Sequence, residues 1–478
     1  MAQETEKAIT NGRIKIGHAD VPRYWTPKSA GNARDKVDQI MARAMEDKVR
    51  FVNLQFTDVM GIVKSVAIPL HQFEDACLNG KWFDGSSIEG FARIAESDMF
   101  LVPDLSTWAV MPWERAEEST ARAICWVYDP NGDLFEGDPR HVLARALDYA
   151  AALGYKFNTG PELEFFLFKM DKEGKITPDT HDVGGYFDLS GDMGADVRKD
   201  MVNALEGMGI KVETSHHEVA RGQHEIDFEY DHTLTTADSA VTLKYTLKAI
   251  AAEHGLHCTF MPKPIFGING SGMHTHQSLS SLEGSDNLFA DAEDAYGISM
   301  LAKKYIAGQL KHARGMCAIL APLVNSYKRL VPGYEAPVYI SWARVNRSAL
   351  IRVPKNRPNK PQAARIELRC PDPSCNPYLA FAVMLRSGLE GIERDIEVPE
   401  PVEENLYHFD ESERRRRNIQ MLPASLPEAL EEMERDELVR ETLGEHIVER
   451  LIEAKRGEWD EFRMQVSQWE VDRYLDVY

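Results

Sequence analysis

The sequence is poor in cysteine, with six in 478 residues, and no two of them form a Cys-x-x-Cys pair. Neither a disulfide framework nor a thiolate zinc site is supported, and the six are expected to be buried thiols in a reducing compartment. The chain also lacks an apolar run near the ~20 residues that span a bilayer. Its N-terminus, MAQETEKAIT, has no cationic-then-apolar signal pattern. These absences favour a cytoplasmic protein without a membrane segment.

The short motifs of common nucleotide and hydrolase sites are missing as well. The sequence has no GxxxxGK[ST] and no GxGxxG, so neither a P-loop nor a dinucleotide-binding Rossmann unit is supported. His224 and Glu225 adjoin, but Phe228 stands where an HExxH motif needs its second His, and no GxSxG nucleophile elbow occurs. Any phosphate chemistry must therefore use another arrangement of residues.

Basic residues are outnumbered, because 76 Asp and Glu face 55 Lys and Arg and give a net charge of −21. The summed field repels phosphate at long range, so nucleic acid and anionic membranes are not expected as main partners. An anionic substrate would need a local cluster of Arg. The 43% hydrophobic and 27% charged composition is that of a globular protein, and the length predicts two to four domains.

The pattern along the chain divides it into three parts. Residues 1–30 lack sustained periodicity and suggest an extension outside the main core. In 31–137, a short helix precedes two apolar runs around Gly61, which predict a hairpin. The segment 138–478 begins with a helix at Asp138, alternates strands, loops and helices, and ends in a helix-rich tail.

The segment PELEFFLFKM, residues 161–170, is the first that could carry chemistry. Read as a strand, it places Glu162 and Glu164 on one face beside two Phe, while three apolar side chains face the other way. Adjacent carboxylates among bulky apolar groups are costly without a cation, because like charges repel in a low dielectric and each loses hydration. This strand alone fits a metal site and an exposed edge with paired surface acids equally well.

Three further segments, RIELRC, HHEVARGQHEIDFEY and NGSGMHTHQSL, present charged or imidazole groups on one strand face or around a Gly-containing turn. These groups are Arg365, Glu367 and Arg369 in the first, Glu218 and Glu225 in the second, and His274 and His276 in the third. One such segment could be accidental. Four of them predict a polar cavity lined by a sheet.

The inventory of side chains indicates which ligands such a cavity would take. Five carboxylates with one or two imidazoles and no thiolate suit hard divalent cations, Mg²⁺ or Mn²⁺, better than Zn²⁺ or Cu. That many oxygen ligands could hold two ions, a recurring device for bringing an anionic phosphate to an anionic nucleophile. Five Arg within 41 positions match carboxylate and phosphate, although each alone would read as a surface ion pair. They are Arg329, Arg347, Arg352, Arg365 and Arg369.

Together these segments resemble type I glutamine synthetase of bacteria and archaea, closer to the alpha branch that is not adenylylated. The resemblance covers about residue 35 to the C-terminus and rests on six ordered segments. They are QFTDVMG at 55, FDGSSIEGFARIAESDM at 83, PELEFF at 161, NGSGMHTHQSL at 269, RLVPGYEAPVYISWARVNRSALIR at 329 and RIELRCPDPSCNPYLAFAVML at 365.

The resemblance implies an α+β fold, with a small N-terminal β-grasp domain and a large catalytic domain whose curved antiparallel sheet is flanked by helices. It implies a homo-oligomer, a dodecamer of two hexameric rings with active sites between neighbouring subunits. The implied activity is ATP-dependent ligation of ammonia to L-glutamate, which gives L-glutamine, ADP and phosphate through γ-glutamyl phosphate.

The resemblance also implies roles for residues that match the family's motifs. Two divalent cations, Mg²⁺ or Mn²⁺, would be held by Glu164, Glu218 and Glu225 and by Glu162, His274 and Glu367. Glutamate would be bound by Asn269, Gly270, Arg329, Glu335 and Arg369. ATP or the transferred phosphoryl group would be addressed by His276, Ser278, Arg347, Arg352 and Arg365, with Arg347 also counted as catalytic.

Two acids are expected to serve the ammonia half of the reaction. Solution ammonia is mostly NH₄⁺ at neutral pH, so an anionic pocket must attract the cation and accept its proton. Asp58 would come from the neighbouring subunit. Glu335 lies in VPGYEAP between Gly333, which allows motion, and Pro337, which stiffens the far end, so a closing flap is expected.

Two positions bear on regulation. Tyr407 in ENLYHF matches a position adenylylated in some type I enzymes, but the following DESERRRRNIQMLPASLPEAL resembles the branch without that control, so adenylylation is not expected. Arg93 in GFARIAESD matches an Arg implicated in glutamine feedback, although Ala95 stands where an acid is common. The run Arg414–Arg417 is expected to be an ion-paired or solvated loop.

Two other functions remain compatible with the sequence. A γ-glutamyl amide ligase that uses another amine would need the ammonium pocket open, whereas Asp58 and Glu335 are both retained. A non-catalytic relative serving as an assembly or metabolite sensor would be expected to lose metal carboxylates, and none is lost. Comparing ammonia with putrescine or ethanolamine as the amine distinguishes the two ligases.

Overall fold

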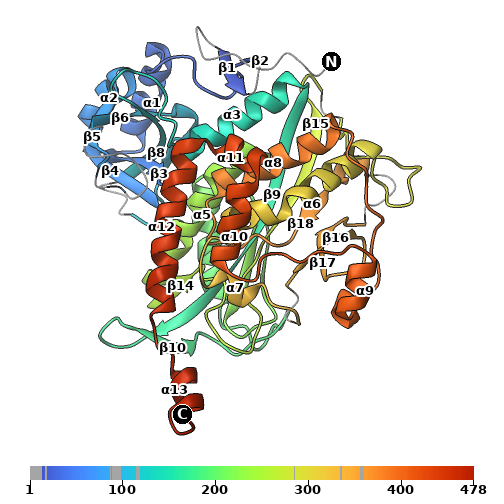
Figure 1. The fold of residues 1–478 in the computed structure, drawn as a ribbon. Coiled ribbons are helices and arrows are strands. Elements are labelled where there is room, and N and C mark those ends of the chain that lie inside the picture. Colours follow the sequence, from blue (N-terminus) through green and yellow to red (C-terminus); the bar gives the residue numbers. More distant parts are fainter. Residues whose placement is uncertain are drawn as a thin grey trace.

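The computed structural model describes residues 13–16, 19–86, 88, 98–114, 119–284, 286–333, 336–355 and 360–478. In this part of the chain, a small N-terminal unit packs beside a larger unit built on a long curved sheet (Figure 1). Each unit combines strands with helices that cover them, so the fold class is α+β, as the resemblance implies.

The N-terminal unit is a sheet covered by helices. Its elements are α1 (Arg34–Glu46), β3 (Val49–Thr57), β4 (Val63–Pro69), η1 (Leu70–Gln72), α2 (Phe73–Asn79), β5 (Lys81–Asp84), β6 (Asp98–Pro103), η3 (Leu105–Thr107), β7 (Ala109–Val110) and β8 (Ser119–Tyr128). The strand order is β4-β3-β8-β6-β5, with β7 also paired to β8. Strands β3 and β8 run parallel, whereas β3 and β4 form the predicted antiparallel hairpin. Helices α1 and α2 share one apolar core with this sheet.

The turn of that hairpin touches the larger unit. Gly61 adopts φ +82°, a left-handed conformation that glycine tolerates better than other residues. A Cβ at Gly61 would lie 3.0 Å from the Cα of Asn376, so a larger residue would have to displace the turn. The hairpin tip is therefore fitted against the start of a helix in the larger unit.

The larger unit is organised around one sheet, which has ten strands within the described ranges. They are β9 (Tyr155–Met170), β10 (Ile176–Thr180), β11 (Val212–His217), β12 (Gln223–Phe228), β13 (Asp231–His232), β14 (Leu256–Thr259), β15 (Met273–Ser281), β16 (Tyr339–Ala343), β17 (Ala349–Arg352) and β18 (Ile366–Leu368). The order is β11-β12-β9-β15-β18-β17-β16, and β10, β13 and β14 also pair with β9. The pairings are antiparallel except that of β16 with β17.

Helices of the larger unit cover one face of this sheet. They are α3 (Pro139–Ala152), α4 (Ala195–Gly207), α5 (Thr233–Glu253), α6 (Met300–Leu320) and α8 (Pro377–Glu393). The larger unit also contains two short helices, α7 (Ser326–Arg329) and η4 (Pro361–Ala363). Side chains of α3, α5, α6 and α8 form the main core with the apolar face of β9, which is made by Leu163, Phe165 and Leu167. Glu162 and Glu164 alternate with these residues and project from the opposite face, as the strand pattern predicts.

Several of these helices begin at a residue that caps the free N–H groups of the first turn. Asp138 accepts a hydrogen bond from the N–H of Arg140 at 3.0 Å, which confirms the predicted start of α3. In the same way, Asn376 caps α8 by accepting from the N–H of Tyr378 at 3.1 Å. Capping residues in the sequence thus set where α3 and α8, two helices of the layer behind the sheet, begin.

The C-terminal part is helical, as predicted. It comprises η5 (Leu406–His408), α9 (Glu411–Arg416), α10 (Leu426–Arg435), α11 (Glu437–Leu443), α12 (Glu445–Arg463) and α13 (Gln468–Tyr474). Helix α13 extends away from the rest of the chain (Figure 1). The expectation of a loop at Arg414–Arg417 is wrong, because Asp410 caps α9 and draws most of that run into a helix. Its ion pairing is confirmed, for example by Arg417 Nη1, which lies 2.8 Å from Glu404 Oε1.

The N-terminal segment does not lie wholly outside the core. After a hairpin of β1 (Arg13–Ile16) and β2 (Ala19–Pro22), the carboxylate of Asp148 in α3 accepts hydrogen bonds from the backbone N–H groups of Tyr24, Trp25 and Thr26. Trp25 also stacks on His232, with ring centroids 3.4 Å apart. The expected N-terminal extension is therefore anchored to α3, because the buried Asp148 carboxylate binds its backbone N–H groups.

The six cysteines are free thiols, and all are buried, as expected from their sparse distribution. None of the helices in the described ranges combines the length and apolar character that a membrane span needs.

Candidate active site

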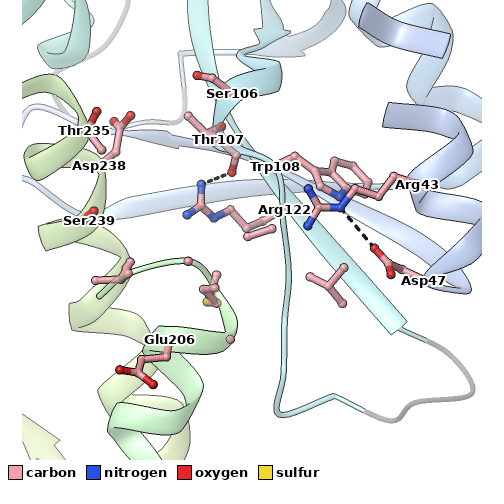
Figure 2. A pocket seen from close by; sticks show the side chains of 16 residues that line it. Arg43, Asp47, Ser106, Thr107, Trp108, Arg122, Glu206, Thr235, Asp238 and Ser239 are labelled. Carbon is pink, nitrogen blue, oxygen red and sulfur yellow. Dashed lines mark hydrogen bonds and ion pairs between the residues drawn. The ribbon is translucent and has the colours of Figure 1, made fainter. Parts of the chain in front are cut away.

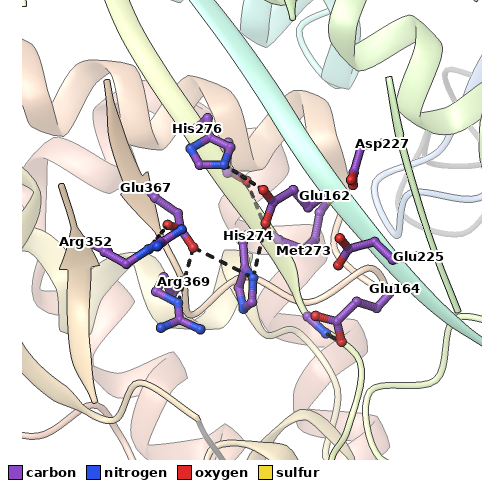
Figure 3. Close-up of polar contacts among 12 residues, drawn as sticks. Glu162, Glu164, Glu225, Asp227, Met273, His274, His276, Arg352, Glu367 and Arg369 are labelled. Carbon is purple, nitrogen blue, oxygen red and sulfur yellow. Dashed lines mark hydrogen bonds and ion pairs between the residues drawn. The ribbon is translucent and has the colours of Figure 1, made fainter. Parts of the chain in front are cut away.

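Strand register brings carboxylates and imidazoles from four strands to one face of the large sheet (Figure 3). Glu162 of β9 lies directly opposite His274 of β15, and Glu164 lies directly opposite Glu225 of β12. Beyond β15, Glu367 of β18 lies directly opposite His276, two residues along β15 from His274. Residues directly opposed on neighbouring strands share a face, so the period-2 patterns converge on one polar surface.

One group on this surface consists of Glu162, His274 and Glu367, whose ligand atoms all lie within 4.8 Å of one another. His274 Nδ1 lies 3.4 Å from Glu162 Oε2 and 3.9 Å from Glu367 Oε1. Burial would raise the pKa of Glu162, but hydrogen bonds with His274 and His276 lower it below its ordinary value. Glu162 is therefore an ionised carboxylate, as a cation ligand must be.

A second group consists of His216, Glu218 and Glu225, again with ligand atoms within 4.8 Å. His216 Nε2 lies 3.1 Å from Glu218 Oε1 and 3.6 Å from Glu225 Oε1. His216 is absent from the ligands predicted from the sequence. Its alternation with Glu218 at the end of β11 is the signal that could have identified it.

Glu164, the remaining predicted ligand, is held in place beside this second group. Its Oε2 accepts hydrogen bonds from Gln223 Nε2 at 2.7 Å and from the N–H of Gly272 at 3.0 Å. Burial and the charge of Glu218 raise the pKa of Glu164 to about 8. The two donors thus fix the position of the Glu164 carboxylate, while burial and the neighbouring charge disfavour its ionised form.

Mutual repulsion is strongest at Glu225. Burial, followed by the charges of Asp227 and Glu164, raises its pKa to about 12. The acidic face therefore takes up protons when no cation is bound, and a divalent cation would relieve the same repulsion. The oxygen-rich donor set, with imidazole and no thiolate, fits Mg²⁺ or Mn²⁺.

Arginine side chains border the acidic face. Arg352 pairs with Oε2 of Glu367, and Arg369 Nε lies 3.3 Å from Oε1 of the same carboxylate. Arg365 Nε donates to His276 Nδ1 at 3.2 Å. Three of the five clustered Arg are therefore at the edge of the site, where they could meet an anionic substrate.

The other two clustered Arg are placed differently. Arg329 is only 5% exposed, and its guanidinium donates to the backbone carbonyls of Cys370 at 2.8 Å and Arg369 at 3.1 Å. Arg347 is exposed, and its own carbonyl accepts a hydrogen bond from Arg369 Nη1 at 3.0 Å. Arg329 thus braces the segment after β18, and contact with a ligand would have to share donors already engaged.

A polar hollow of about 360 Å³ adjoins the first group. It is lined in part by Glu162, His276, Ser278 and Arg365, which include three of the residues predicted to address ATP. A neighbouring hollow of about 550 Å³ shares Ser278 and Asn158 with it. Together they provide an extended polar space beside Glu162.

A separate hollow of about 720 Å³ lies between the N-terminal unit and helices α4 and α5 (Figure 2). There, Arg122 donates to the Thr107 carbonyl at 2.6 Å and to Thr242 Oγ1 at 3.3 Å. Arg43 lies 3.7 Å from Asp47. These cations are engaged by neighbours, and none of the described residues lining this hollow belongs to the predicted site.

The loop before β15 carries two residues predicted to bind glutamate, Asn269 and Gly270. A Cβ at Gly270 would collide with the carbonyl oxygen of Pro262, so the close approach of the two backbones requires glycine. The Gly270 carbonyl accepts a hydrogen bond from Gln223 at 3.2 Å, and the same amide group holds Glu164. The structure thus places this loop beside the second group.

Three predicted residues lie apart from these groups or outside the described part. Asp58 is in the turn between β3 and β4, where its side chain accepts a hydrogen bond from the N–H of Ile62 at 2.8 Å and lies 3.2 Å from Lys64 Nζ. Glu335 and Arg93 lie outside the described residues.

A third group, Asp182, His217 and His224, was not predicted. All three side chains are buried, with ligand atoms within 4.8 Å of one another. His217 follows His216 directly, and strand alternation turns it away from the acidic face. Because Asp182 lies in a distant loop, no local pattern could reveal this pairing.

A curved sheet that gathers two carboxylate–imidazole groups beside arginines and a polar hollow defines a metal-dependent enzyme that acts on anionic substrates. The chain belongs to the glutamine synthetase family. Residues 136–474 match the family model "Glutamine synthetase, catalytic domain", and residues 48–130 match "Glutamine synthetase, beta-Grasp domain".

Its relatives agree over most of the chain. It is 52% identical over 441 residues to the glutamine synthetase of Methanosarcina mazei, covering 92% of this chain and 98% of the relative. Identity to the glutamine synthetase of Thermus thermophilus is 52% over 446 residues, covering 92% and 99%. Among solved structures, GmaS in its ADP complex has a TM-score of 0.82 at 31% identity, covering 91% of this chain and 99% of that one.

Proposed function

We propose that this chain is a glutamate–ammonia ligase, which joins ammonia to L-glutamate with ATP and releases L-glutamine, ADP and phosphate. Membership of the glutamine synthetase family supports this activity. The observation that carries it is the convergence, on one sheet face, of carboxylates and imidazoles from separate strands. Divalent cations bound at this face would neutralise the charges of ATP and glutamate, two anions that otherwise repel each other.

The two groups would each hold a divalent cation, Mg²⁺ or Mn²⁺. One cation belongs to Glu162, His274 and Glu367. The other belongs to Glu164, Glu218 and Glu225, with His216 close enough to contribute. When bound, such ions neutralise negative charge on the phosphates and on the carboxylate that attacks them.

The chain's own residues would position both anions. Arg369, Arg329 and the Asn269–Gly270 loop would bind glutamate, and the polar hollow at His276, Ser278 and Arg365 would take the nucleotide. Arg347 and Arg352 would address the transferred phosphoryl group. The side-chain carboxylate of glutamate then takes the γ-phosphoryl group of ATP to give γ-glutamyl phosphate and ADP, because a free carboxylate is a poor acyl donor.

Asp58 and Glu335 would complete the second half-reaction. An anionic pocket attracts NH₄⁺ and accepts its proton, so that neutral ammonia displaces phosphate from γ-glutamyl phosphate. Burial raises the pKa of Asp58, and hydrogen bonds with Ile62 and Lys64 oppose that rise. Glu335, as the base, would also close the site from its flap.

We also propose the family's assembly, a dodecamer of two hexameric rings in which Asp58 reaches the neighbouring subunit's site. Apolar side chains left exposed on the single chain support partner surfaces, among them Trp82 on the N-terminal unit and Trp469 on α13. Light scattering of the full chain and of a form ending at Arg463, which lacks α13, tests this. We expect twelve chains in the first and a smaller assembly in the second.

Further parts of the proposal concern boundaries, location and control. We place the domains at 1–30, 31–137 and 138–478, and we place the protein in the cytoplasm, where its buried free thiols stay reduced. We propose that Tyr407 is not adenylylated and that the chain belongs to the alpha branch, because the segment DESERRRRNIQMLPASLPEAL that follows Phe409 resembles that branch. Arg93 is the proposed element of glutamine feedback.

The decisive experiment is phosphate release from ATP, measured with and without glutamate and with and without ammonium. Release that requires both substrates supports the proposal. Replacing ammonium with putrescine or ethanolamine separates ammonia ligation from ligation of another amine. Release that is independent of glutamate, or faster with the bulky amine, would overturn it.

A further inference from the structure

A buried pair, Asp182 and His217, lies behind the second cation group and has no part in the proposed chemistry. Both side chains have 0% exposure, and Asp182 Oδ1 lies 2.9 Å from His217 Nε2. On the other edge of the ring, His217 Nδ1 lies 2.6 Å from the backbone carbonyl oxygen of Glu218. The imidazole therefore bridges a carboxylate and the main chain of a proposed metal ligand.

The partners of His217 determine the hydrogens on its ring. A carbonyl oxygen and an ionised carboxylate can only accept, so both ring nitrogens donate. The ring therefore links the Asp182 carboxylate to the Glu218 carbonyl, with one hydrogen bond on each of its two edges.

Asp182 also ties down the turn that carries Glu218. Its Oδ1 accepts a hydrogen bond from the N–H of Gly222 at 3.0 Å, and its Oδ2 accepts from the N–H of Gly194 at 3.2 Å. Glu218 and Gly222 belong to the turn between β11 and β12, which leads to Glu225. One carboxylate therefore secures that turn at both ends, through His217 at the first and Gly222 at the second.

The third member of the cluster, His224, accepts a hydrogen bond at Nδ1, and its Nε2 has no hydrogen-bond partner among the described residues. Arg198 Nη1 lies 2.9 Å from His224 Nδ1, and a guanidinium can only donate, so Nδ1 accepts. The hydrogen of the neutral ring is then on Nε2, and a protonated nitrogen cannot coordinate a metal. Arg198 itself pairs with Asp192 at 2.6 Å, which fixes the guanidinium beside the ring.

The surrounding backbone is packed tightly on both rings. A Cβ at Gly194 would collide with the His224 ring, and a Cβ at Gly184 would lie 3.0 Å from His217 Nε2. A divalent cation would have to displace this backbone and the hydrogen bonds that Asp182 already accepts. The cluster is therefore a hydrogen-bonded brace.

We infer that Asp182 and His217 are positioning residues that hold the Glu218 turn so that Glu218, Glu225 and His216 surround one cation. This inference rests on the proposed metal site. Outer partners of metal ligands are worth roughly 10- to 100-fold in metal affinity. Loss of the brace should therefore weaken one class of cation site and leave the site at Glu162 intact.

The test measures Mn²⁺ binding to the metal-free, full-length protein. Titration calorimetry and the electron paramagnetic resonance signal of free Mn²⁺ give the number of ions bound and their affinities. In Asp182→Asn and His217→Ala we expect the same number of ions per chain as in the unaltered protein. One class should bind about 10- to 100-fold more weakly. His217→Gln, which keeps a donor toward the Glu218 carbonyl, should recover part of the affinity.

Asp436→Asn is the matched control. Asp436 forms a second carboxylate–imidazole pair, partly buried, with its Oδ2 2.7 Å from His312 Nδ1 in the helical layer. This variant should lower the melting temperature yet leave both Mn²⁺ affinities within about twofold, which separates a positioning role from general destabilisation. If Asp182→Asn does not fold, as judged by circular dichroism, the comparison of His217→Gln with His217→Ala decides instead.

The outcomes are distinct. Mn²⁺ affinities within twofold of the unaltered protein in the folded variants would overturn the inference. Loss of one whole ion per chain, with the other affinities unchanged, would also overturn it and make the cluster a third metal site. Failure of the unaltered protein to bind Mn²⁺ at all would instead overturn the proposed metal site.

Discussion

Glu164 of β9 and Glu225 of β12 lie directly opposite each other on neighbouring antiparallel strands, where two like charges destabilise a sheet. Both carboxyls are buried, and burial together with adjacent carboxylates raises the pKa of each, to about 8 and about 12. The strand register that supports the fold thus forces a local repulsion. Relief of that repulsion by a cation links the stability of the sheet to the proposed function.

This relationship predicts that the metal-free protein loses stability as pH rises from about 5 to 8. A carboxyl whose folded-state pKa lies above its unfolded value takes up a proton on folding. Its stabilising contribution is complete below the unfolded pKa and is lost as pH rises through the folded pKa. For Glu164 that window runs from 4.5 to about 8. Urea unfolding at several pH values should show a fall of up to ~1.4 kcal/mol per pH unit from this one proton.

The controls for this prediction isolate Glu164 from other titrating groups. Glu164→Gln should reduce the pH dependence by the share of one proton and leave the share of Glu225, whose pKa is raised further. The exposed Glu253→Gln should leave the pH dependence as it is. Saturating Mn²⁺ should also flatten it, because a cation replaces the proton. An unchanged slope in Glu164→Gln would contradict the assignment of the repulsion to this residue.

The acidic face could be predicted because its signal is local. Glu162 and Glu164 alternate with apolar residues over a few positions, and a period of two is enough to place them on one face. His216 follows the same rule at the end of β11. Glu218 and Glu225 are the ligands predicted from this segment, and His216 is not among them. The face of a strand, and so the donor set of the site, is encoded in short segments.

Contacts across long sequence distances could not be predicted. Asp182, in a loop, contacts His217 35 positions further along the chain, and Asp148 accepts a hydrogen bond from the backbone N–H of Trp25 across 123 positions. Arg329, which we propose binds glutamate, also donates to backbone carbonyls 40 or more positions away in the chain, and the sequence did not indicate these contacts. Such contacts depend on the tertiary structure, and the periodic pattern of residues within one strand or helix does not reveal them.

Glu162 and Glu367 should prove to be cation ligands. We expect Glu162→Ala and Glu367→Ala each to raise the half-saturating Mg²⁺ concentration at least about tenfold, because each removes one charged ligand of a three-residue group. Glu173→Ala, in the exposed turn after β9, is the control. Titration of Mg²⁺ in the phosphate-release assay gives the value, and an unchanged half-saturation in either variant would count against its being a ligand.

Glu335→Ala should separate nucleotide binding from synthesis. The change removes the proposed base and gate for ammonia but none of the groups around the polar hollow. We expect ATP binding within about twofold of normal and a loss of synthesis of roughly 10²- to 10⁴-fold, the usual contribution of a general base. Equilibrium binding of a fluorescent ATP analogue and ammonia-dependent glutamine formation measure the two. Normal turnover with ammonium would remove Glu335 from the mechanism.

Asp148→Ala should release the N-terminal segment from the body of the protein. The Asp148 carboxylate accepts from the N–H groups of Trp25 at 2.7 Å and Tyr24 at 2.8 Å, and its removal leaves these donors without a buried partner. An unsatisfied buried donor costs about 1–3 kcal/mol, so we expect a loss of about 2 kcal/mol in unfolding free energy. Trypsin should then cut at Arg23 and Lys28 faster than in the unaltered protein. Asp148→Asn, which keeps one acceptor oxygen, should lie between the two, and equal cleavage in all three would show that the anchor does not hold the segment.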